Sequence, residues 1–179
     1  MHIAIVLGTR PEIIKMSPII RYCEERGLDY SLIHTGQHYS YELDAAFFHE
    51  LELPRPDYKL DVGSGTHAEQ TGKILVGLES ILMRDRPDVV LVQGDTNTVM
   101  GSALSAAKLN VDVGHVEAGL RSWDRTMPEE VNRLLTDHLS RYLFAPTEKA
   151  KSNLLLEGID PDRIWVAGNT VVDAVLQNI

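Results

Sequence analysis

The chain has 179 residues, of which 44% are hydrophobic and 24% are charged, as is typical of one globular domain. Its formal net charge of −9 argues against a nucleic-acid partner, because binding nucleic acid requires a basic face. The only cysteine, Cys23, excludes an intramolecular disulfide and fits a reducing compartment. Its acidic neighbours predict a structural thiol. The apolar residues at the start of the sequence are not preceded by basic residues and are too few to span a membrane, so we expect a soluble, cytoplasmic protein.

Short apolar runs alternate with longer helical patterns along the chain. Each run is nearly continuous in apolar character and rich in Val and Ile, which is typical of strands covered on both faces of a parallel sheet. The runs occupy residues 2–8, 30–36, 88–94, 111–117, 142–147 and 163–168.

The segments between these runs carry helix signals. Thr66 and Glu69 have the spacing of a capping box, and Pro87 ends the helix that follows them. Gly27 and Gly158 fall where helices end, the usual place for a left-handed cap. This alternation predicts an α/β fold, a doubly wound, mostly parallel, Rossmann-like sheet with right-handed crossovers.

Ligands of such sheets bind beyond the carboxyl ends of the strands. These strand ends form one rim of the sheet. At the first of them, the stretch GTRPEIIK begins with Gly8 at a tight turn. Pro11 stands at the start of the helix that follows, and the N-terminal amides of that helix can bind an anion. Arg10 and Lys15 add positive charge, so a phosphate site is one interpretation and a sharp turn with two solvated cations is the other. The glycines of the dinucleotide fingerprint are missing, and nothing asks for NAD.

Two further loops lie at the same rim. Gln37 and His38 follow the second run, and His38 either contacts a ligand or is simply exposed, with exposure favoured. Asp95 and Thr96 follow the third run, at the start of a helix that we expect to reach Leu109. Both residue types are favoured helix N-caps, so capping and catalysis remain alternatives for this pair.

Glu117 follows the fourth run, where a carboxylate has no local structural role. It could act as an acid or base near neutral pH, and the alternative is an ion pair with Arg121. His115 and Glu117 suggest a metal pair, but no third ligand has suitable spacing, so we expect no metal.

A helix then begins near Pro128 with two acids in its first turn. Glu129 and Glu130 there are ordinary complements of the helix dipole. Arg133 lies one turn later, where it could contact a phosphate or pair with Glu129 at i,i+4. Together these residues suggest a negatively charged ligand beside several carboxylates that can transfer protons.

The motifs of the chain resemble those of one enzyme family, the non-hydrolysing UDP-N-acetylglucosamine 2-epimerases. The matching stretches are, in order, GTRPEIIKMSP, GQHY, VLVQGDTNT, GHVEAGLRS, PEEVNR and GNTVVDA. They cover the chain from Gly8 to Ala174 but only the N-terminal half of the family's length. The resemblance implies a two-lobed enzyme of the GT-B type, with residues 1–170 as the first Rossmann-like lobe and 171–179 as the start of a helix toward a second lobe.

The resemblance also implies the chemistry. UDP-GlcNAc and UDP-ManNAc are interconverted by elimination of UDP, which leaves a 2-acetamidoglucal, and by its return after protonation on the opposite face. No cofactor takes part. By motif, Asp95, Glu117 and Glu129 match the catalytic acids, with Glu117 our choice for the base. Residues expected to bind substrate are Arg10, Lys15, Arg133 and Thr96.

Other members bind a second UDP-GlcNAc as an activator, and here the matching residues are Gln37, His38 and Lys73. Lys73 stands where an arginine is expected, and lysine cannot reproduce bidentate binding. The resemblance further implies a homodimer in polysaccharide biosynthesis and no activity of this lobe alone, because half of the cleft is missing. The alternatives are a hydrolysing epimerase, which releases ManNAc and UDP, and a nucleotide-sugar-binding lobe with no activity.

Overall fold

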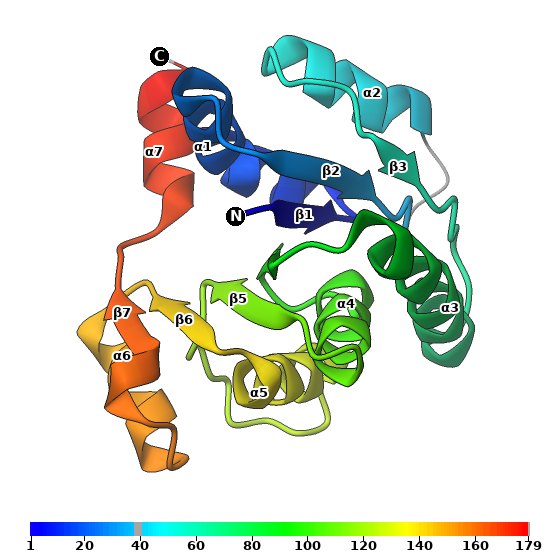
Figure 1. Ribbon diagram of the computed structural model, residues 1–179. Helices are drawn as coiled ribbons and strands as arrows, with labels where there is room; N and C mark the ends of the chain where they lie inside the picture. Colours follow the sequence, from blue (N-terminus) through cyan, green and yellow to red (C-terminus); the bar gives the residue numbers. More distant parts are fainter. Residues whose placement is uncertain (38–40, 179) are drawn as a thin grey trace.

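The computed structural model describes residues 1–37 and 41–178, which form one parallel sheet covered by helices (Figure 1). The order of the seven described strands is β3-β2-β1-β4-β5-β6-β7, and every neighbouring pair is parallel. The elements are β1 (Ile3–Leu7), α1 (Arg10–Arg26), β2 (Tyr30–His34), α2 (Tyr41–Glu50), β3 (Tyr58–Lys59), α3 (His67–Asp85), β4 (Val89–Gln93), α4 (Asn97–Lys108), β5 (Asp112–Val116), α5 (Pro128–Leu139), β6 (Tyr142–Ala145), α6 (Glu148–Leu156), the 3-10 turn Pro161–Arg163, β7 (Ile164–Val166) and α7 (Thr170–Gln177).

This architecture confirms the doubly wound, Rossmann-like α/β fold. All six apolar runs form strands, and the sheet is entirely parallel in the described residues rather than mostly so. The strand that the sequence did not indicate is β3, which pairs with the end of β2. It has only two residues, and Lys59 is exposed, so it contains no apolar run to recognise.

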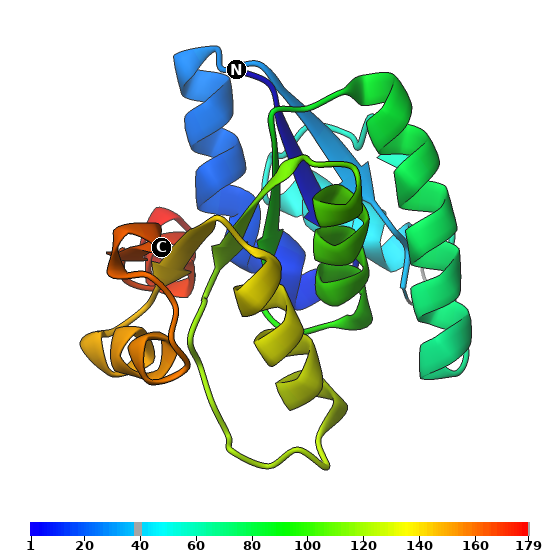
Figure 2. The same ribbon diagram turned by 60° about the horizontal axis from the view of Figure 1, so that its bottom comes forward.

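Helices cover both faces of the sheet. Ile5 and Leu7 of β1 pack against α1, whereas the alternate residues Ala4 and Val6 pack in a second cluster with α3 and α4. Both clusters are buried, which explains why β1 is apolar at every position. The helices α1, α2 and α7 lie on one face, and α3, α4, α5 and α6 lie on the other (Figures 1 and 2).

The expected helix ends are confirmed. Thr66 and Glu69 form the capping box of α3, with the Glu69 backbone N–H donating to the Thr66 hydroxyl oxygen at 3.2 Å. Gly27 and Gly158 have φ of 57° and 81° in the left-handed region. At the end of α3, Arg86 is the left-handed C-cap and Pro87 follows it.

The last helix, α7, packs against α1 (Figure 1). Arg21 of α1 donates hydrogen bonds to the side chains of Gln177 and Asn178, at 3.0 and 3.1 Å. The division of the chain at residue 170 coincides with the start of α7 and stays a prediction. No helix in the described ranges 1–37 and 41–178 has both the length and the apolar character needed to cross a bilayer.

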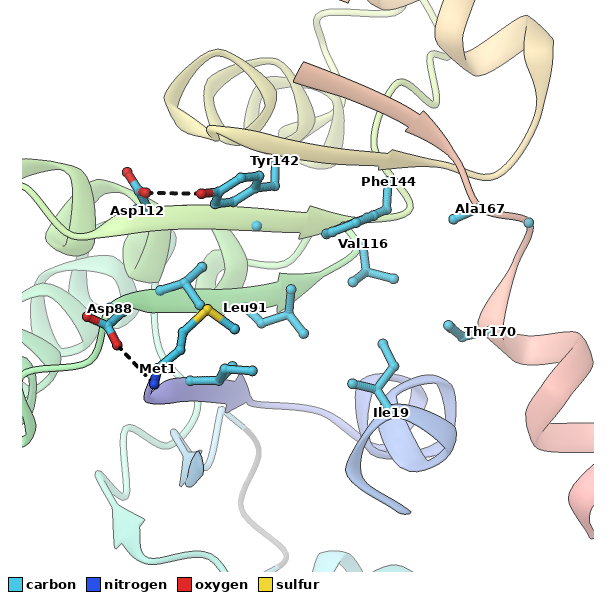
Figure 3. A pocket seen from close by; sticks show the side chains of 14 residues that line it. Met1, Ile19, Asp88, Leu91, Asp112, Val116, Tyr142, Phe144, Ala167 and Thr170 are labelled. Carbon is cyan, nitrogen blue, oxygen red and sulfur yellow. Dashed lines mark hydrogen bonds and ion pairs between the residues drawn. The ribbon is translucent and has the colours of Figure 1, made fainter. Parts of the chain in front are cut away.

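A cavity of about 630 Å³ lies on the face of the sheet that bears α1 and α7 (Figure 3). Its wall consists mainly of apolar side chains from the sheet and from α1, including Leu91, Val116 and Phe144. The carboxylates at its edge are engaged: Asp88 lies 3.9 Å from the N-terminal amine, and Asp112 accepts the Tyr142 hydroxyl at 3.4 Å. This wall offers apolar packing rather than groups that could transfer protons.

Candidate functional site

A second cavity, of about 220 Å³, lies at the carboxyl ends of β1, β4 and β5. The strand order reverses between β1 and β4, and doubly wound sheets bind ligands at this switch point. The cavity is therefore in the position that the fold predicts for a ligand, although it is the smaller of the two. Its lining residues are Thr9, Pro11, Glu12, Lys15, Gln93, Gly94, Asp95, Thr96, Glu117 and Leu120.

Glu117 follows β5 with a φ of 73°, a left-handed conformation that is unusual for a residue with a side chain. Its carboxylate accepts hydrogen bonds from Lys15 at 3.0 and 2.7 Å and from the Asn169 amide at 2.9 Å. The side-chain amide of Gln93 also donates to it. The side chain is 9% exposed, so Glu117 faces the cavity with three donors around it.

The alternative that Glu117 pairs with Arg121 is wrong. Arg121 turns away into the protein, where its guanidinium lies 2.8 Å from Asp137 and 2.6 Å from Glu157. The side chain of Arg121 has no exposed surface. Lys15 is therefore the cation of Glu117, and Arg121 belongs to a buried network.

Asp95 lies at the start of the loop after β4 and pairs with Arg133 of α5 at 2.5 Å. Arg133 also donates to Glu130 at 2.8 Å, an i,i+3 contact. The alternative in which Arg133 pairs with Glu129 at i,i+4 is therefore wrong. Burial opposes the charge of Arg133, but its bonds to Glu130 and Asp95 outweigh this and raise its pKa above the ordinary value.

Glu130 anchors the long loop that joins β5 to α5, which Figure 2 shows as a wide excursion from the sheet. Its carboxylate accepts the backbone N–H groups of Ser122 and Trp123, each at 3.0 Å. Burial would raise the pKa of Glu130, but these bonds and Arg133 lower it. Glu129 is exposed at the surface, so the buried acid of this helix turn is Glu130, which the sequence indicated only as a dipole complement.

Glu12 lies beneath the cavity at the first turn of α1. One carboxylate oxygen accepts the Thr96 hydroxyl at 2.7 Å, and the other accepts the N–H groups of Gly8 and Thr9 at 2.5 and 3.2 Å. These two amides precede the first residue of α1, Arg10, and are already satisfied by Glu12. Burial raises the pKa of Glu12 to about 7, although all three hydrogen bonds act to lower it.

Thr96 is the N-cap of α4, and its hydroxyl accepts from the Val99 N–H at 3.4 Å. The helix ends at Lys108, one residue before the predicted end at Leu109. Capping is therefore established for Thr96, and its bond to Glu12 also links it to α1. Asp95 does not cap through its side chain, which pairs with Arg133 instead.

Three other predicted residues, Arg10, Gln37 and Lys73, lie outside the lining of this cavity. Arg10 is 3.5 Å from Asp44. The Gln37 amide oxygen accepts the Thr98 N–H at 3.1 Å, and Lys73 donates to the Val62 carbonyl at 3.1 Å. His38 lies outside the described residues.

Several residues of the site were missed from the sequence. Thr9 and Glu12 have the same S/T-x-x-E spacing that identified the start of α3, so this capping box was available as a signal. Gln93 ends an apolar run, where a polar residue at the rim of a sheet is informative. Asn169 gave only the weaker signal of a helix N-cap, a role it also has for α7.

The arrangement suits proton transfer beside an anion. Two carboxylates, Asp95 and Glu117, are each paired with a partly exposed cation, Arg133 and Lys15 respectively. An anionic ligand can compete for these cations and leave the carboxylates available to exchange protons. Within residues 1–37 and 41–178 no three His, Cys, Asp or Glu side chains are grouped so that they could bind a metal ion.

Comparison with known proteins identifies relatives of the chain. A family model described as UDP-N-acetylglucosamine 2-epimerase matches residues 21–179. The UDP-N-acetylglucosamine 2-epimerase of Methanocaldococcus jannaschii is 64% identical over 179 residues, which are all of this chain and 49% of that protein. The UDP-2,3-diacetamido-2,3-dideoxy-D-glucuronate 2-epimerase of Pseudomonas aeruginosa is 42% identical and matches 98% of this chain and 51% of that protein.

The fold agrees with this relationship. The crystal structure of the Methanocaldococcus jannaschii enzyme in complex with UDP-GlcNAc and UDP superimposes with a TM-score of 0.97 and 64% identity. The superposition covers 99% of this chain and 49% of that one, and this chain spans about half the length of the curated relatives it matches. It corresponds to the N-terminal, Rossmann-like lobe of a GT-B-type enzyme, and it belongs to the UDP-N-acetylglucosamine 2-epimerase family.

Proposed function

We propose that this chain is the N-terminal lobe of a non-hydrolysing epimerase that interconverts UDP-GlcNAc and UDP-ManNAc. The observation that supports it best is the pair of carboxylates, Asp95 and Glu117, each beside a cation that an anion can reach. The 64% identity to an enzyme named for UDP-N-acetylglucosamine favours that sugar over the diacetamido sugar of the 42% identical relative.

The reaction needs a base, an acid and a place for a diphosphate. In the first half, Glu117 removes the proton from C2 while the bond from C1 to the UDP oxygen breaks, which leaves a 2-acetamidoglucal. In the second half, an acid returns a proton to the opposite face of C2, and the UDP oxygen forms the bond to C1 again. We assign the acid to Asp95 or Glu129. No electrons are gained or lost, so the chemistry needs no redox cofactor.

Lys15 and Arg133 serve the leaving group in this proposal. Lys15 is 27% exposed and Arg133 is 17% exposed, so both can turn toward a diphosphate at the cavity. A cation that moves from a carboxylate to the ligand stabilises the departing charge and frees the carboxylate to act as a base. Arg10 and Thr96 are assigned to nucleotide contacts on the same rim.

A cavity of about 220 Å³ is smaller than the roughly 300–1,000 Å³ of sites that enclose a small ligand. We therefore place the ligand between this lobe and a second one, and we expect no turnover by this chain alone. The two-lobe protein, in which a second half of the kind found in the relatives follows this chain, is the form to assay.

Proton NMR of UDP-GlcNAc in D2O tests the proposal. We expect UDP-ManNAc signals and deuterium at C2 with the two-lobe protein, and neither with this chain alone. Free ManNAc together with UDP would support the hydrolysing alternative. Absence of any exchange with the two-lobe protein would support a binding lobe without activity.

Glu117→Gln gives a sharper test, because it keeps the shape and removes the base. We expect kcat of the two-lobe protein to fall on the order of 1,000-fold, in the range measured for loss of a general base. Glu79→Gln, an exposed carboxylate on α3, is the matched control and should keep the activity of the parent protein. Equal activity of the two variants would exclude Glu117 as the base.

The proposal includes assembly. The two-lobe protein forms a homodimer, which sedimentation will test.

The proposal also includes activation. Gln37, His38 and Lys73 contribute to an activating UDP-GlcNAc site. The Gln70 amide donates hydrogen bonds to the carbonyls of Gln37 and Gly63, and Lys73 donates to the neighbouring Val62 carbonyl. Activation is tested by the dependence of UDP-ManNAc turnover on added UDP-GlcNAc, which Lys73→Met should weaken.

A further inference from the structure

His115, in the middle of the sheet, is bonded through both ring nitrogens. Nδ1 lies 2.6 Å from an Asp137 carboxylate oxygen, and Nε2 lies 2.8 Å from the Gly94 carbonyl oxygen. A carboxylate and a backbone carbonyl both accept, so each ring nitrogen faces an acceptor. Neither His115 nor Asp137 has exposed surface.

One of these bonds fixes the turn that bears Asp95. Gly94 has a φ of 89°, and its N–H donates to the Val116 carbonyl at 3.1 Å. Its carbonyl accepts from His115, so both backbone groups of Gly94 are bonded to β5. Asp95 follows at once, and its own carbonyl accepts from Asn132 at 2.9 Å. The position of Asp95 is thus set through Gly94.

The other bond leads to the turn that bears Glu117. The second oxygen of Asp137 accepts the Gly119 N–H at 3.1 Å and lies 2.8 Å from Arg121. The Gly119 carbonyl accepts from Asn153 at 2.9 Å, so this turn is bonded on both sides two residues after Glu117. Gly119 also has a φ of 81°, and a side chain there would collide with the Ala150 backbone.

Asp137 is ionised in this setting. Burial acts to raise its pKa, but the charges and hydrogen bonds of His115 and Arg121 outweigh burial and lower it. Glu157 lies 2.6 Å from Arg121, on the side away from Asp137. None of these four side chains (His115, Asp137, Arg121 and Glu157) lines the cavity.

We propose that His115 and Asp137 are positioning residues of the epimerase, a charged pair that keeps the turns of Asp95 and Glu117 in fixed register across β4 and β5. This inference rests on the proposed function. Neither residue touches substrate: each acts through the backbone of a turn, His115 through Gly94 and Asp137 through Gly119. Small displacements of catalytic groups have large effects on rate, so a pair that holds these two turns in place increases the rate of the reaction.

Two substitutions separate positioning from packing. In His115→Asn the side-chain amide lies near the place of Nδ1, so it can bond Asp137 but not Gly94. In His115→Gln the amide lies near the place of Nε2, so it can bond Gly94 but not Asp137. Both lose a buried ring and its charge, so both should lower the stability of the protein by similar amounts.

We expect the rates of the two-lobe variants to differ. In His115→Asn, where Gly94 is released, kcat should fall on the order of 100-fold, with KM changed less than about threefold. In His115→Gln the fall in kcat should be about tenfold or less. Equal kcat in the two variants, or a loss of kcat that follows stability alone, would overturn the inference.

A measurement without turnover tests the ring itself. Nitrogen-15 NMR of the His115 side chain should show a proton on both nitrogens at neutral pH, and Asp137→Asn should remove one of them. A ring nitrogen without a proton in the parent protein would overturn the charged pair. An inactive parent protein would overturn the proposed function together with the catalytic role of the pair, whereas an active parent with an unimpaired His115→Asn variant would overturn the pair alone.

Discussion

Two groups of charged side chains meet at the turns after β4 and β5, and they differ in burial. In the inner group, His115, Asp137 and Arg121 are at most 1% exposed. In the outer group, Lys15 and Arg133 are 27% and 17% exposed, and each pairs with a carboxylate at the cavity. Ion pairs of similar length therefore have two uses in one lobe. A buried pair cannot exchange partners, whereas a pair open to solvent can give its cation to an anionic ligand.

The largest effect on stability is expected in the inner group. Arg121→Met removes the cation between Asp137 and Glu157, which leaves Asp137 with His115 as its remaining ion-pair partner and deprives Glu157 of its partner at 2.6 Å. The free energy of unfolding should fall by about 3–5 kcal/mol, the usual cost of breaking a buried pair from one side. Urea unfolding measures this, with Arg55→Met at an exposed position as the control. A loss no larger than that of the control would remove the distinction between the two groups.

A smaller, pH-dependent effect is expected at Glu12, which is buried like the inner group but borders the outer one. Its pKa is raised by burial from 4.5 to about 7 in the folded protein. Between these values the unfolded chain loses the proton and the folded chain keeps it, so stability falls as pH rises. The difference in unfolding free energy between the parent protein and Glu12→Gln should therefore change by roughly 3 kcal/mol between pH 4.5 and 7.

The Gln side chain supports this comparison, because its oxygen can accept from Gly8 and Thr9 while its amide donates to the Thr96 hydroxyl. The contributions of other carboxylates cancel in the difference between the two proteins. Parallel stability curves over this pH range would show that Glu12 has no raised pKa.

Glu12 also illustrates what sequence can and cannot predict. The apolar runs predict six of the seven described strands, because burial on both faces of a parallel sheet requires such runs. They also place Asp95 and Glu117 at the carboxyl ends of strands, where the cavity lies. The sequence does not predict which side chains far apart in the chain form ion pairs. Lys15 and Glu117 are 102 residues apart, and no local pattern says that Lys15 rather than Arg121 is the partner of Glu117. That choice depends on the direction in which each side chain leaves its turn.

The same limit applies to His115. The sequence analysis considered a metal pair with Glu117, because both side chains are common ligands, and rejected it for lack of a third ligand, but it did not predict the contact of His115 with Asp137. Adjacent positions of a strand point to opposite faces, and His115 points to the face that bears α5, where the Asp137 carboxylate accepts a hydrogen bond from its Nδ1. Glu117 lies beyond the end of β5 in a left-handed conformation, so its direction does not follow the alternation of the strand.

The smallest effect on stability, with a clear effect on binding, is expected in the outer group. Lys15→Met breaks a pair that is partly open to water and leaves Glu117 with the Gln93 and Asn169 donors. The free energy of unfolding should change by about 1 kcal/mol or less. Loss of a charged hydrogen bond to the diphosphate should weaken UDP binding to the two-lobe protein by roughly 10- to 100-fold.

Calorimetry with UDP measures the second effect, and Lys108→Met is the matched control. Lys108 is an exposed lysine at the end of α4 opposite Thr96, so it loses the same charge far from the cavity. If Lys15→Met binds UDP as the control does, the Lys15 cation does not transfer to the ligand and the outer pair is structural. If it loses affinity while remaining stable, the contrast with Arg121→Met separates the pair that binds the ligand from the network that supports the lobe.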